Sequence, residues 1–126
     1  MQKTITALLV IIGIIHILPI TGLLGAEKLS KLYGFQTEDN TLILLMRHRA
    51  VLFGILGVFF VFAAFRQAYQ PLAFVMAGVS ILSFLILEKL ESPVHEAIGK
   101  VVIADWIALA CLFVAICLWF LSKRTG

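Results

Sequence analysis

The sequence predicts an all-α integral membrane protein in which four helices, antiparallel to their neighbours, form one bundle. Two features of composition lead to this prediction: 62% of the 126 residues are hydrophobic and only 13% are charged. A soluble domain carries about 25% charged residues, and the mean hydropathy of +1.09 is too high for such a domain. The third feature is the order of the chain, in which four apolar stretches alternate with short polar segments. We therefore expect a single transmembrane domain over residues 1–126.

The first apolar stretch covers residues 4–25, where His16 is the only strongly polar side chain. About 20 apolar residues are enough to cross the hydrocarbon of a bilayer as a helix. Pro19 lacks the amide hydrogen that would bond to the Ile15 carbonyl, which predicts a kink or a freed carbonyl acceptor beside His16. The mixed residues 26–40 that follow predict a short interfacial helix and a turn between the first and second spans.

The remaining spans are predicted at residues 41–65, 71–87 and 101–121. Only residues 66–70 separate the second span from the third. Pro71 suits the first turn of a helix, because an amide hydrogen at this position would have no partner within the helix. A connection this short requires the second and third helices to run antiparallel as neighbours.

Four spans place both termini and the connection at residues 66–70 on one side of the bilayer. Basic residues without any acidic ones occupy that side: Lys3, Arg66, Lys123 and Arg124. All seven carboxylates belong to the opposite half: Glu27, Glu38, Asp39, Glu88, Glu91, Glu96 and Asp105. Positive charge favours the cytoplasmic side of a membrane. We therefore expect both termini in the cytoplasm, although the loops on the two sides carry equal numbers of Lys and Arg.

Small residues indicate which face of each helix packs inside the bundle, because helices in lipid associate through close backbone approach. At about 100° per residue, Ala50, Gly54 and Gly57 share one face of the second span, and Arg47 continues it. We therefore expect Arg47 to point into the bundle. Arg49 is expected on the other side, where its long side chain reaches the headgroups. The corresponding faces of the other spans are formed by Thr6, Leu9, Gly13 and His16, by Ala73, Ala77 and Ser80, and by Ala104, Ala108, Cys111 and Ala115.

Four polar side chains from three spans lie at a similar depth in the carboxylate-bearing half: His16, Arg47, His48 and Asp105. A charged group at this depth costs several kcal/mol unless it is paired or hydrated. We predict a ligand-binding polar pocket near one leaflet, in which Arg47 holds an anionic or carbonyl oxygen and His16 or His48 exchanges a proton. A second interpretation stays open, in which Arg47 pairs with Asp105, His16 bonds a freed carbonyl, and the network only holds the helices in register.

Glu88, Glu91 and His95 are secondary site candidates because their spacing of three and four residues suits one face of a helix. Pro93 interrupts that helix, and carboxylates at the end of a span are usually solvated, so we expect no metal ion there.

The ten basic residues are scattered between apolar stretches, and no nucleic-acid partner is expected. Ion conduction would need polar residues through both leaflets, whereas the half near Arg66 is almost wholly apolar.

Three segments carry recognisable motifs: Gly13-x-x-His16-x-x-Pro19, Met46-Arg47-His48-Arg49-Ala50-x-Leu52-Phe53-Gly54-x-Leu56-Gly57 and Val101-Val102-Ile103-Ala104-Asp105. In these motifs, in length and in layout, the chain resembles a small bacterial family of four-span, DoxX-like membrane proteins. The resemblance covers nearly the whole chain. It implies four transmembrane helices in a bacterial inner membrane and an association with membrane redox assemblies and quinone-linked oxidation.

Chains very similar to this one are often labelled phosphopantetheine adenylyltransferase. That enzyme is a soluble nucleotide-binding α/β protein with an HxGH-type phosphate motif. Here His16 is followed by Ile17, Leu18 and Pro19 in an apolar helix, so we do not carry that activity over.

Three functions remain open from the sequence. The first is a binding or accessory subunit that holds a quinone, a lipid headgroup or a similar amphiphile for a redox or envelope system, with membrane lipid and a membrane redox protein as partners. The second is a membrane-embedded enzyme on a lipid-soluble substrate, with His16 or His48 as general acid or base and Arg47 as oxyanion partner. The third is a structural or interaction protein. A homo-oligomer is compatible with each function.

Overall fold

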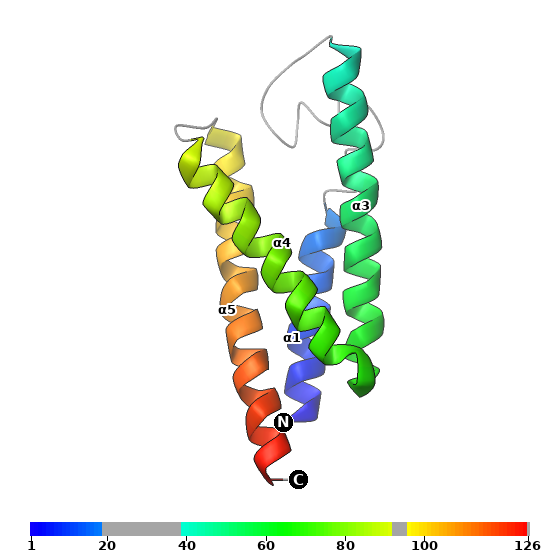
Figure 1. The fold of residues 1–126 in the computed structure, drawn as a ribbon, viewed down its shortest axis with the longest axis vertical. Helices are drawn as coiled ribbons and strands as arrows, with labels where there is room; N and C mark the ends of the chain where they lie inside the picture. Colours follow the sequence, from blue (N-terminus) through cyan, green and yellow to red (C-terminus); the bar gives the residue numbers. More distant parts are fainter. Residues whose placement is uncertain (19–38, 92–95, 126) are drawn as a thin grey trace.

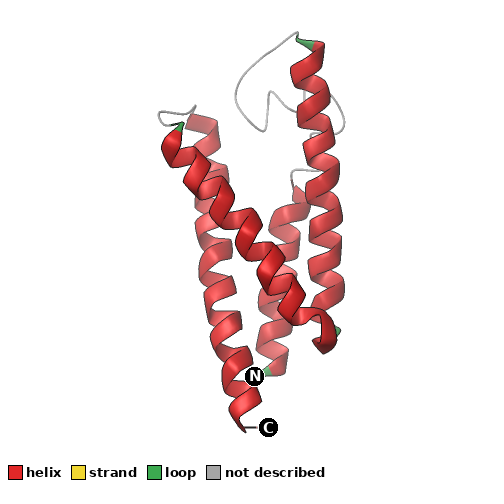
Figure 2. Cartoon of the chain, viewed as in Figure 1, coloured by secondary structure: helices red, strands yellow, loops and turns green. Residues whose placement is uncertain are grey.

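The computed structural model describes residues 1–18, 39–91 and 96–125 of the chain. Every regular element in these residues is helical, which confirms the predicted all-α bundle (Figures 1 and 2). The elements are four α-helices and one short 3-10 helix: α1 (Gln2–Ile17), α3 (Asn40–Ala64), η2 (Gln67–Tyr69), α4 (Gln70–Leu90) and α5 (Glu96–Thr125).

The chain is a helical membrane protein, as its composition predicts. Three segments are long and apolar enough to cross a membrane, with mean hydropathies of 1.8, 2.0 and 2.7: Asn40–Ala64, Gln67–Leu90 and Val101–Thr125. α1 is also apolar but shorter, with 16 residues. The rest of the predicted first span, the kink at Pro19 and nearly all of the predicted interfacial helix fall in residues 19–38, outside the described part of the chain.

Polar side chains close both ends of α3. At its start, the Asp39 carboxylate accepts a hydrogen bond of 2.9 Å from the Thr41 amide, as a helix cap does. At its end, the Ala64 carbonyl has no partner within the helix and accepts two bonds from other elements. The Thr6 hydroxyl donates at 2.8 Å and the Gln70 side-chain amide at 3.3 Å. These bonds tie α1 and the start of α4 to the end of α3.

The chain reverses between α3 and α4 within a few residues. η2 forms the turn, and Pro71 lies in the first turn of α4, as predicted. The two helices therefore run antiparallel (Figure 1).

α1 occupies the middle of the bundle, where it packs along both α3 and α5, and α4 packs along α5. α3 and α4 make few contacts with each other. They lie close at their connection and separate toward the opposite end (Figure 1). Both chain termini lie at the end that carries this connection, as four spans require (Figure 1).

The small-residue faces pack inward as predicted. Ala50, Gly54 and Gly57 are buried on α3, and Leu9, Gly13 and His16 are buried on α1. Ala73 and Ala77 of α4 and Ala108 and Ala115 of α5 are fully buried, while Thr6, Ser80, Ala104 and Cys111 are half-buried.

Two glycines mark the closest approach between helices. A Cβ atom placed on Gly57 would lie 2.6 Å from the Gly13 carbonyl oxygen and would also collide with Ile17. A Cβ atom on Gly13 would lie 2.8 Å from the Gly57 carbonyl oxygen. α1 and α3 therefore touch backbone to backbone, which brings His16, one turn beyond Gly13, against α3.

Candidate functional site

His16 is buried on α1, with 2% of its surface exposed, and both of its ring nitrogens have partners. Nδ1 lies 2.9 Å from the Ile12 carbonyl oxygen, and Nε2 lies 3.1 Å from the Ser80 hydroxyl oxygen on α4. A carbonyl only accepts hydrogen bonds, so Nδ1 carries the hydrogen. In the neutral ring Nε2 is then the acceptor, and the Ser80 hydroxyl donates to it.

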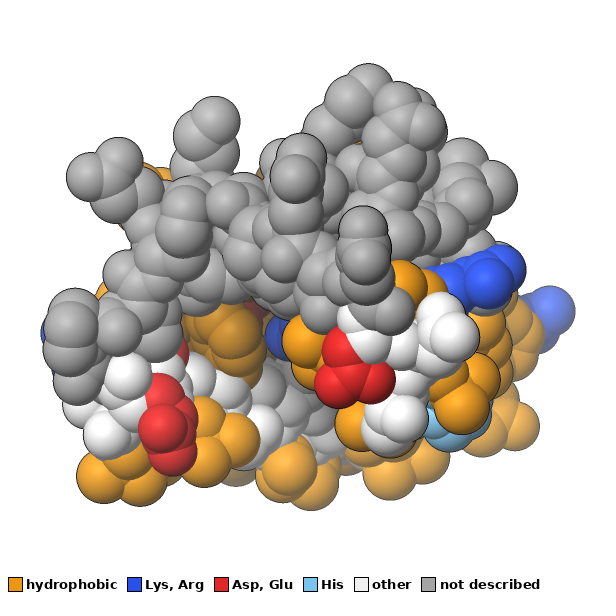
Figure 3. All heavy atoms as spheres, turned by 90° about the horizontal axis from the view of Figure 1, so that it is seen from above, with side chains coloured by type: hydrophobic (Ala, Val, Ile, Leu, Met, Phe, Trp, Pro, Cys, Tyr) orange, Lys and Arg blue, Asp and Glu red, His pale blue; other side chains and the backbone are white. Residues whose placement is uncertain are grey.

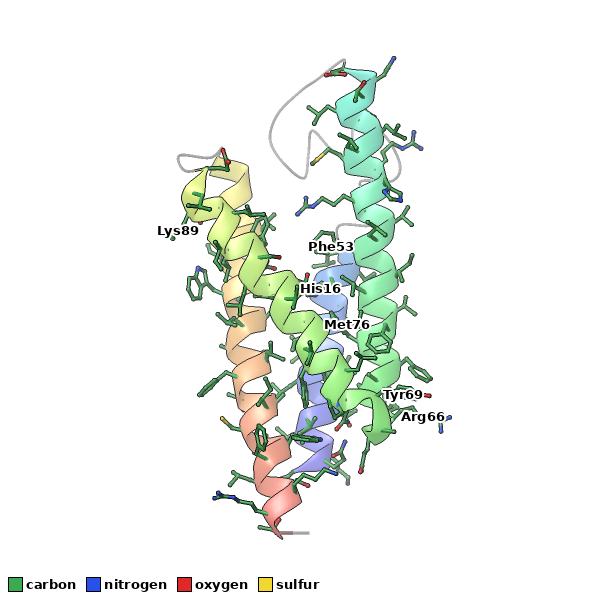
Figure 4. The ribbon with its side chains drawn as sticks, in the orientation of Figure 1. His16, Phe53, Arg66, Tyr69, Met76 and Lys89 are labelled. Atoms are coloured by element: carbon green, nitrogen blue, oxygen red, sulfur yellow. The ribbon has the colours of Figure 1, made fainter. Side chains whose placement is uncertain are left out.

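Phenylalanine rings of α3 surround the imidazole. Phe60 meets it edge to face, with ring centroids 4.9 Å apart and an interplanar angle of 89°. The Phe53 centroid lies 5.6 Å from the imidazole centroid, and Figure 4 shows the two residues together at one level of the bundle. These rings keep water away from His16, which strengthens its two hydrogen bonds.

Arg49 lies over the Phe53 ring. Its guanidinium carbon is 4.8 Å from the Phe53 centroid and 5.9 Å from the centroid of Phe84 on α4, both within the range of cation–π attraction. The positive charge of Arg49 also acts on the carboxylate of Asp105 on α5. Both charged side chains are half-buried.

Each of the four helices therefore contributes one polar side chain to the same region, and we call this set the inner polar cluster: His16, Arg49, Ser80 and Asp105. Phe53 contacts both His16 and Arg49 and so joins the two halves of the cluster. His16 and Asp105 belong to the predicted set, whereas Arg49 and Ser80 stand in the cluster in place of the predicted Arg47 and His48.

The predicted orientations of Arg47 and Arg49 are wrong. Arg47 and His48 are exposed, whereas Arg49 is half-buried. The prediction assumed that α3 has a single buried face, but two adjoining faces of α3 are buried. Its small residues meet α1, and the adjoining face, which bears Phe60 with none of its surface exposed, is also buried. Arg49 continues that second face.

The pairing of Arg47 with Asp105 in the second interpretation is also replaced, because Arg49 is the residue whose charge acts on Asp105. Of the four predicted ligand-binding residues, the structure brings His16 and Asp105 to the inner polar cluster and leaves Arg47 and His48 on the surface.

The secondary candidates do not form one group in the described part of the chain. Glu88 is half-buried, and its Oε2 atom is buried without a hydrogen-bond partner, whereas Glu91 is exposed. His95 lies outside the described residues. Among residues 1–18, 39–91 and 96–125, no three His, Cys, Asp or Glu side chains lie close enough together to hold a metal ion.

On α4, Ser80 and Phe84 are site residues that the sequence analysis did not assign to the pocket. The signal for Ser80 was its position on the small-residue face of α4, three residues after the buried Ala77 and thus about one turn along the same face. Phe84 follows one turn later.

Exposed apolar side chains flank Arg49 on α3. Figure 3 looks down on the end of the molecule that carries the start of α3 and shows hydrophobic side chains next to acidic ones there. Leu45 and Leu52, each about one turn from Arg49 on the same face of α3, are 61% and 49% exposed. The half-buried Arg49 therefore lies beside an exposed apolar surface of α3.

Replacing Ser80 with alanine is expected to lower the free energy of unfolding by about 0.6 kcal/mol, the average effect of an interhelical hydrogen bond in a membrane protein. The Ile12 carbonyl keeps His16 in the Nδ1–H form in both proteins, which ¹⁵N NMR of the imidazole ring reports. Ser83→Ala is the matched control, because the exposed Ser83 hydroxyl bonds only the Ser80 carbonyl of its own helix. Equal losses in the two variants, or an Nε2–H ring in the parent protein, would contradict this arrangement.

Comparisons of the chain with known protein families, with characterised proteins and with solved structures find no match.

Proposed function

We propose that this membrane protein is a binding subunit that holds an amphiphile, a quinone or a lipid, with the polar head of the molecule against Arg49. The environment of Arg49 is the observation that carries this proposal. The guanidinium lies half-buried near the rings of Phe53 and Phe84. A guanidinium donates hydrogen bonds to carbonyl or phosphate oxygens, and the rings offer flat apolar surface. A quinone ring with its carbonyl groups, or a lipid headgroup, needs this combination.

The separation of α3 from α4 supports access to this site from the membrane. The two helices make few contacts with each other. The exposed Leu45 and Leu52 flank Arg49 and offer contacts to an apolar tail. Asp105, on whose carboxylate the charge of Arg49 acts, adds a negative charge to this polar end.

We infer that the protein works in a bacterial inner membrane with both termini in the cytoplasm. The end that carries the termini bears Lys3, Arg66, Lys123 and Arg124 in the sequence, and positive charge favours the cytoplasmic side. The resemblance to DoxX-like proteins supports a quinone as ligand and a membrane redox protein as partner.

The test is titration of the detergent-purified protein with decylubiquinone, followed by quenching of tryptophan fluorescence. Arg49→Gln is expected to weaken binding about tenfold, because loss of one charged hydrogen bond costs about 1.5 kcal/mol. The exposed Arg47→Gln serves as the control and should stay within about twofold. Mass spectrometry of the molecules that co-purify tests the lipid alternative. Equal weakening of decylubiquinone binding by the two variants would contradict the proposal. A parent protein that retains neither quinone nor lipid would also contradict it.

The hydrogen bond between Ser80 and His16 favours a second candidate, a membrane-embedded enzyme. Nε2 of His16 is placed to take the Ser80 proton, which would make the hydroxyl oxygen nucleophilic. The same co-purification experiment separates the two functions. An enzyme converts the bound molecule, and the Ser80→Ala variant does not. With a binding subunit, the co-purified molecule is chemically unchanged in both the parent protein and the Ser80→Ala variant.

A further inference from the structure

We propose a separate lipid site on the outer surface of α4 and α5, where an anionic phospholipid lays an acyl chain in an apolar groove and places its phosphate against Lys89. The groove lies between the two helices and has a volume of about 410 Å³. Leu82 and Ile86 of α4 and Trp106 of α5 are among its apolar lining residues, and Lys89 is the one charged residue among those lining residues that the structure describes.

The groove faces away from the inner polar cluster. At about 100° per residue, Leu82, Ile86 and Lys89 share one face of α4, whereas Ser80 and Phe84, which belong to the region of His16 and Arg49, point to another. A ligand in the groove therefore does not compete with one at Arg49.

The carboxylates near the end of α4 do not line the groove. Glu91 lies about 200° around the helix from Lys89, and Glu88 lies about 100° away with its Oε2 atom buried. The groove consequently presents a positive charge at one end of an apolar surface. A phospholipid with a negative headgroup and a hydrocarbon chain has the complementary pattern.

The depth of Lys89 suits a phosphate group. It lies in the last turn of α4, a membrane-spanning helix, and Figure 4 shows it at the end of that helix remote from the connection with α3. Lys side chains at span ends extend to the headgroup level, and aromatic side chains such as that of the half-exposed Trp106 favour the same boundary. From there Leu82 and Ile86, 46% and 58% exposed, continue the groove toward the bilayer interior.

The membrane supplies the occupant. Because α4 spans the bilayer, the exposed side chains of the groove contact lipid, and its volume falls in the range of about 300–1,000 Å³ that is usual for ligand sites. What distinguishes this site from ordinary lipid contact is the charge of Lys89. One Lys near an anionic headgroup changes affinity about fivefold.

The test is native mass spectrometry of the purified protein with equimolar phosphatidylglycerol and phosphatidylcholine of identical acyl chains. The parent protein should retain phosphatidylglycerol about fivefold better, and Lys89→Gln should abolish this preference. Lys123→Gln is the matched control, because Lys123 lies at the other end of the bundle over the Trp119 ring. Leu82→Trp, which fills the groove, should reduce retention of both lipids, and circular dichroism checks that each variant stays helical.

Three results would overturn this site. One is an equal loss of preference in Lys89→Gln and Lys123→Gln, which indicates unspecific attraction. Another is unchanged retention in Leu82→Trp. The third is an Arg49→Gln variant that loses the preference as Lys89→Gln does, which would place the lipid at the inner polar cluster. Failure of quinone binding, in contrast, leaves this site unaffected.

Discussion

Replacing Gly57 with alanine is expected to lower the free energy of unfolding by about 2 kcal/mol, because the added methyl group has no space between α1 and α3. Its carbon would lie 2.6 Å from the Gly13 carbonyl oxygen, and a backbone atom in a helix cannot turn aside as a side chain can. The helices must then move apart. Such a shift also loosens the contacts of His16 with Phe53 and Phe60, which lie close to the crossing. Unfolding in mixed micelles with increasing SDS, followed by circular dichroism, measures the loss.

Gly78→Ala is the matched control for this experiment. The nearest atom to a Cβ at Gly78 is a Leu112 methyl carbon at 3.8 Å, an ordinary van der Waals distance. Alanine is the better helix former, so this variant should be as stable as the parent or slightly more so. A loss at Gly78 as large as that at Gly57 would show that any added methyl group disturbs the bundle, and the close crossing would then have no special role.

Replacing Arg49 with leucine is expected to cost about 2 kcal/mol of stability, whereas Arg47→Leu should change it by less than about 0.5 kcal/mol. Removal of Arg49 leaves the half-buried Asp105 carboxylate without the positive charge that acts on it. It also removes the packing of the guanidinium on Phe53 and Phe84. Breaking a fully buried pair costs about 3–5 kcal/mol, and the partial exposure of both groups reduces the effect.

A double-mutant cycle tests whether this cost comes from the pair. If Arg49 acts through Asp105, then Asp105→Asn should remove much of the effect of Arg49→Leu. The double variant should then lose less stability than the sum of the two single losses. Additive losses would assign the role of Arg49 to its ring contacts alone. A larger effect for Arg47→Leu than for Arg49→Leu would contradict the orientation of α3 described here.

The helices and their ends were predictable because they depend on neighbours in the sequence. Apolar stretches of span length specify α3, α4 and α5, the Asp39 cap starts α3, and Pro71 suits the first turn of α4. The small-residue faces were also predictable, because helical periodicity places Ala50, Gly54 and Gly57 on one face and close packing in lipid selects that face.

The composition of the inner polar cluster was only partly predictable. His16 and Asp105 could be chosen because a polar group inside an apolar span needs a partner wherever it points. The choice between Arg47 and Arg49 failed, since periodicity tells which residues share a face of α3 and does not tell how many neighbouring helices cover it. Ser80 has an ordinary sequence context, and nothing local links it to a histidine 64 residues away.

The sequence by itself therefore determined a helical membrane protein and the approximate positions of α3, α4 and α5, because hydropathy and helical periodicity are local properties. Only the tertiary structure decided that Arg49 turns inward, that Ser80 meets His16, and that α3 and α4 separate beside them. These features depend on the rotation and height of each helix relative to the others. The contact between Gly13 and Gly57 and the packing of α1 between α3 and α5 set that rotation and height.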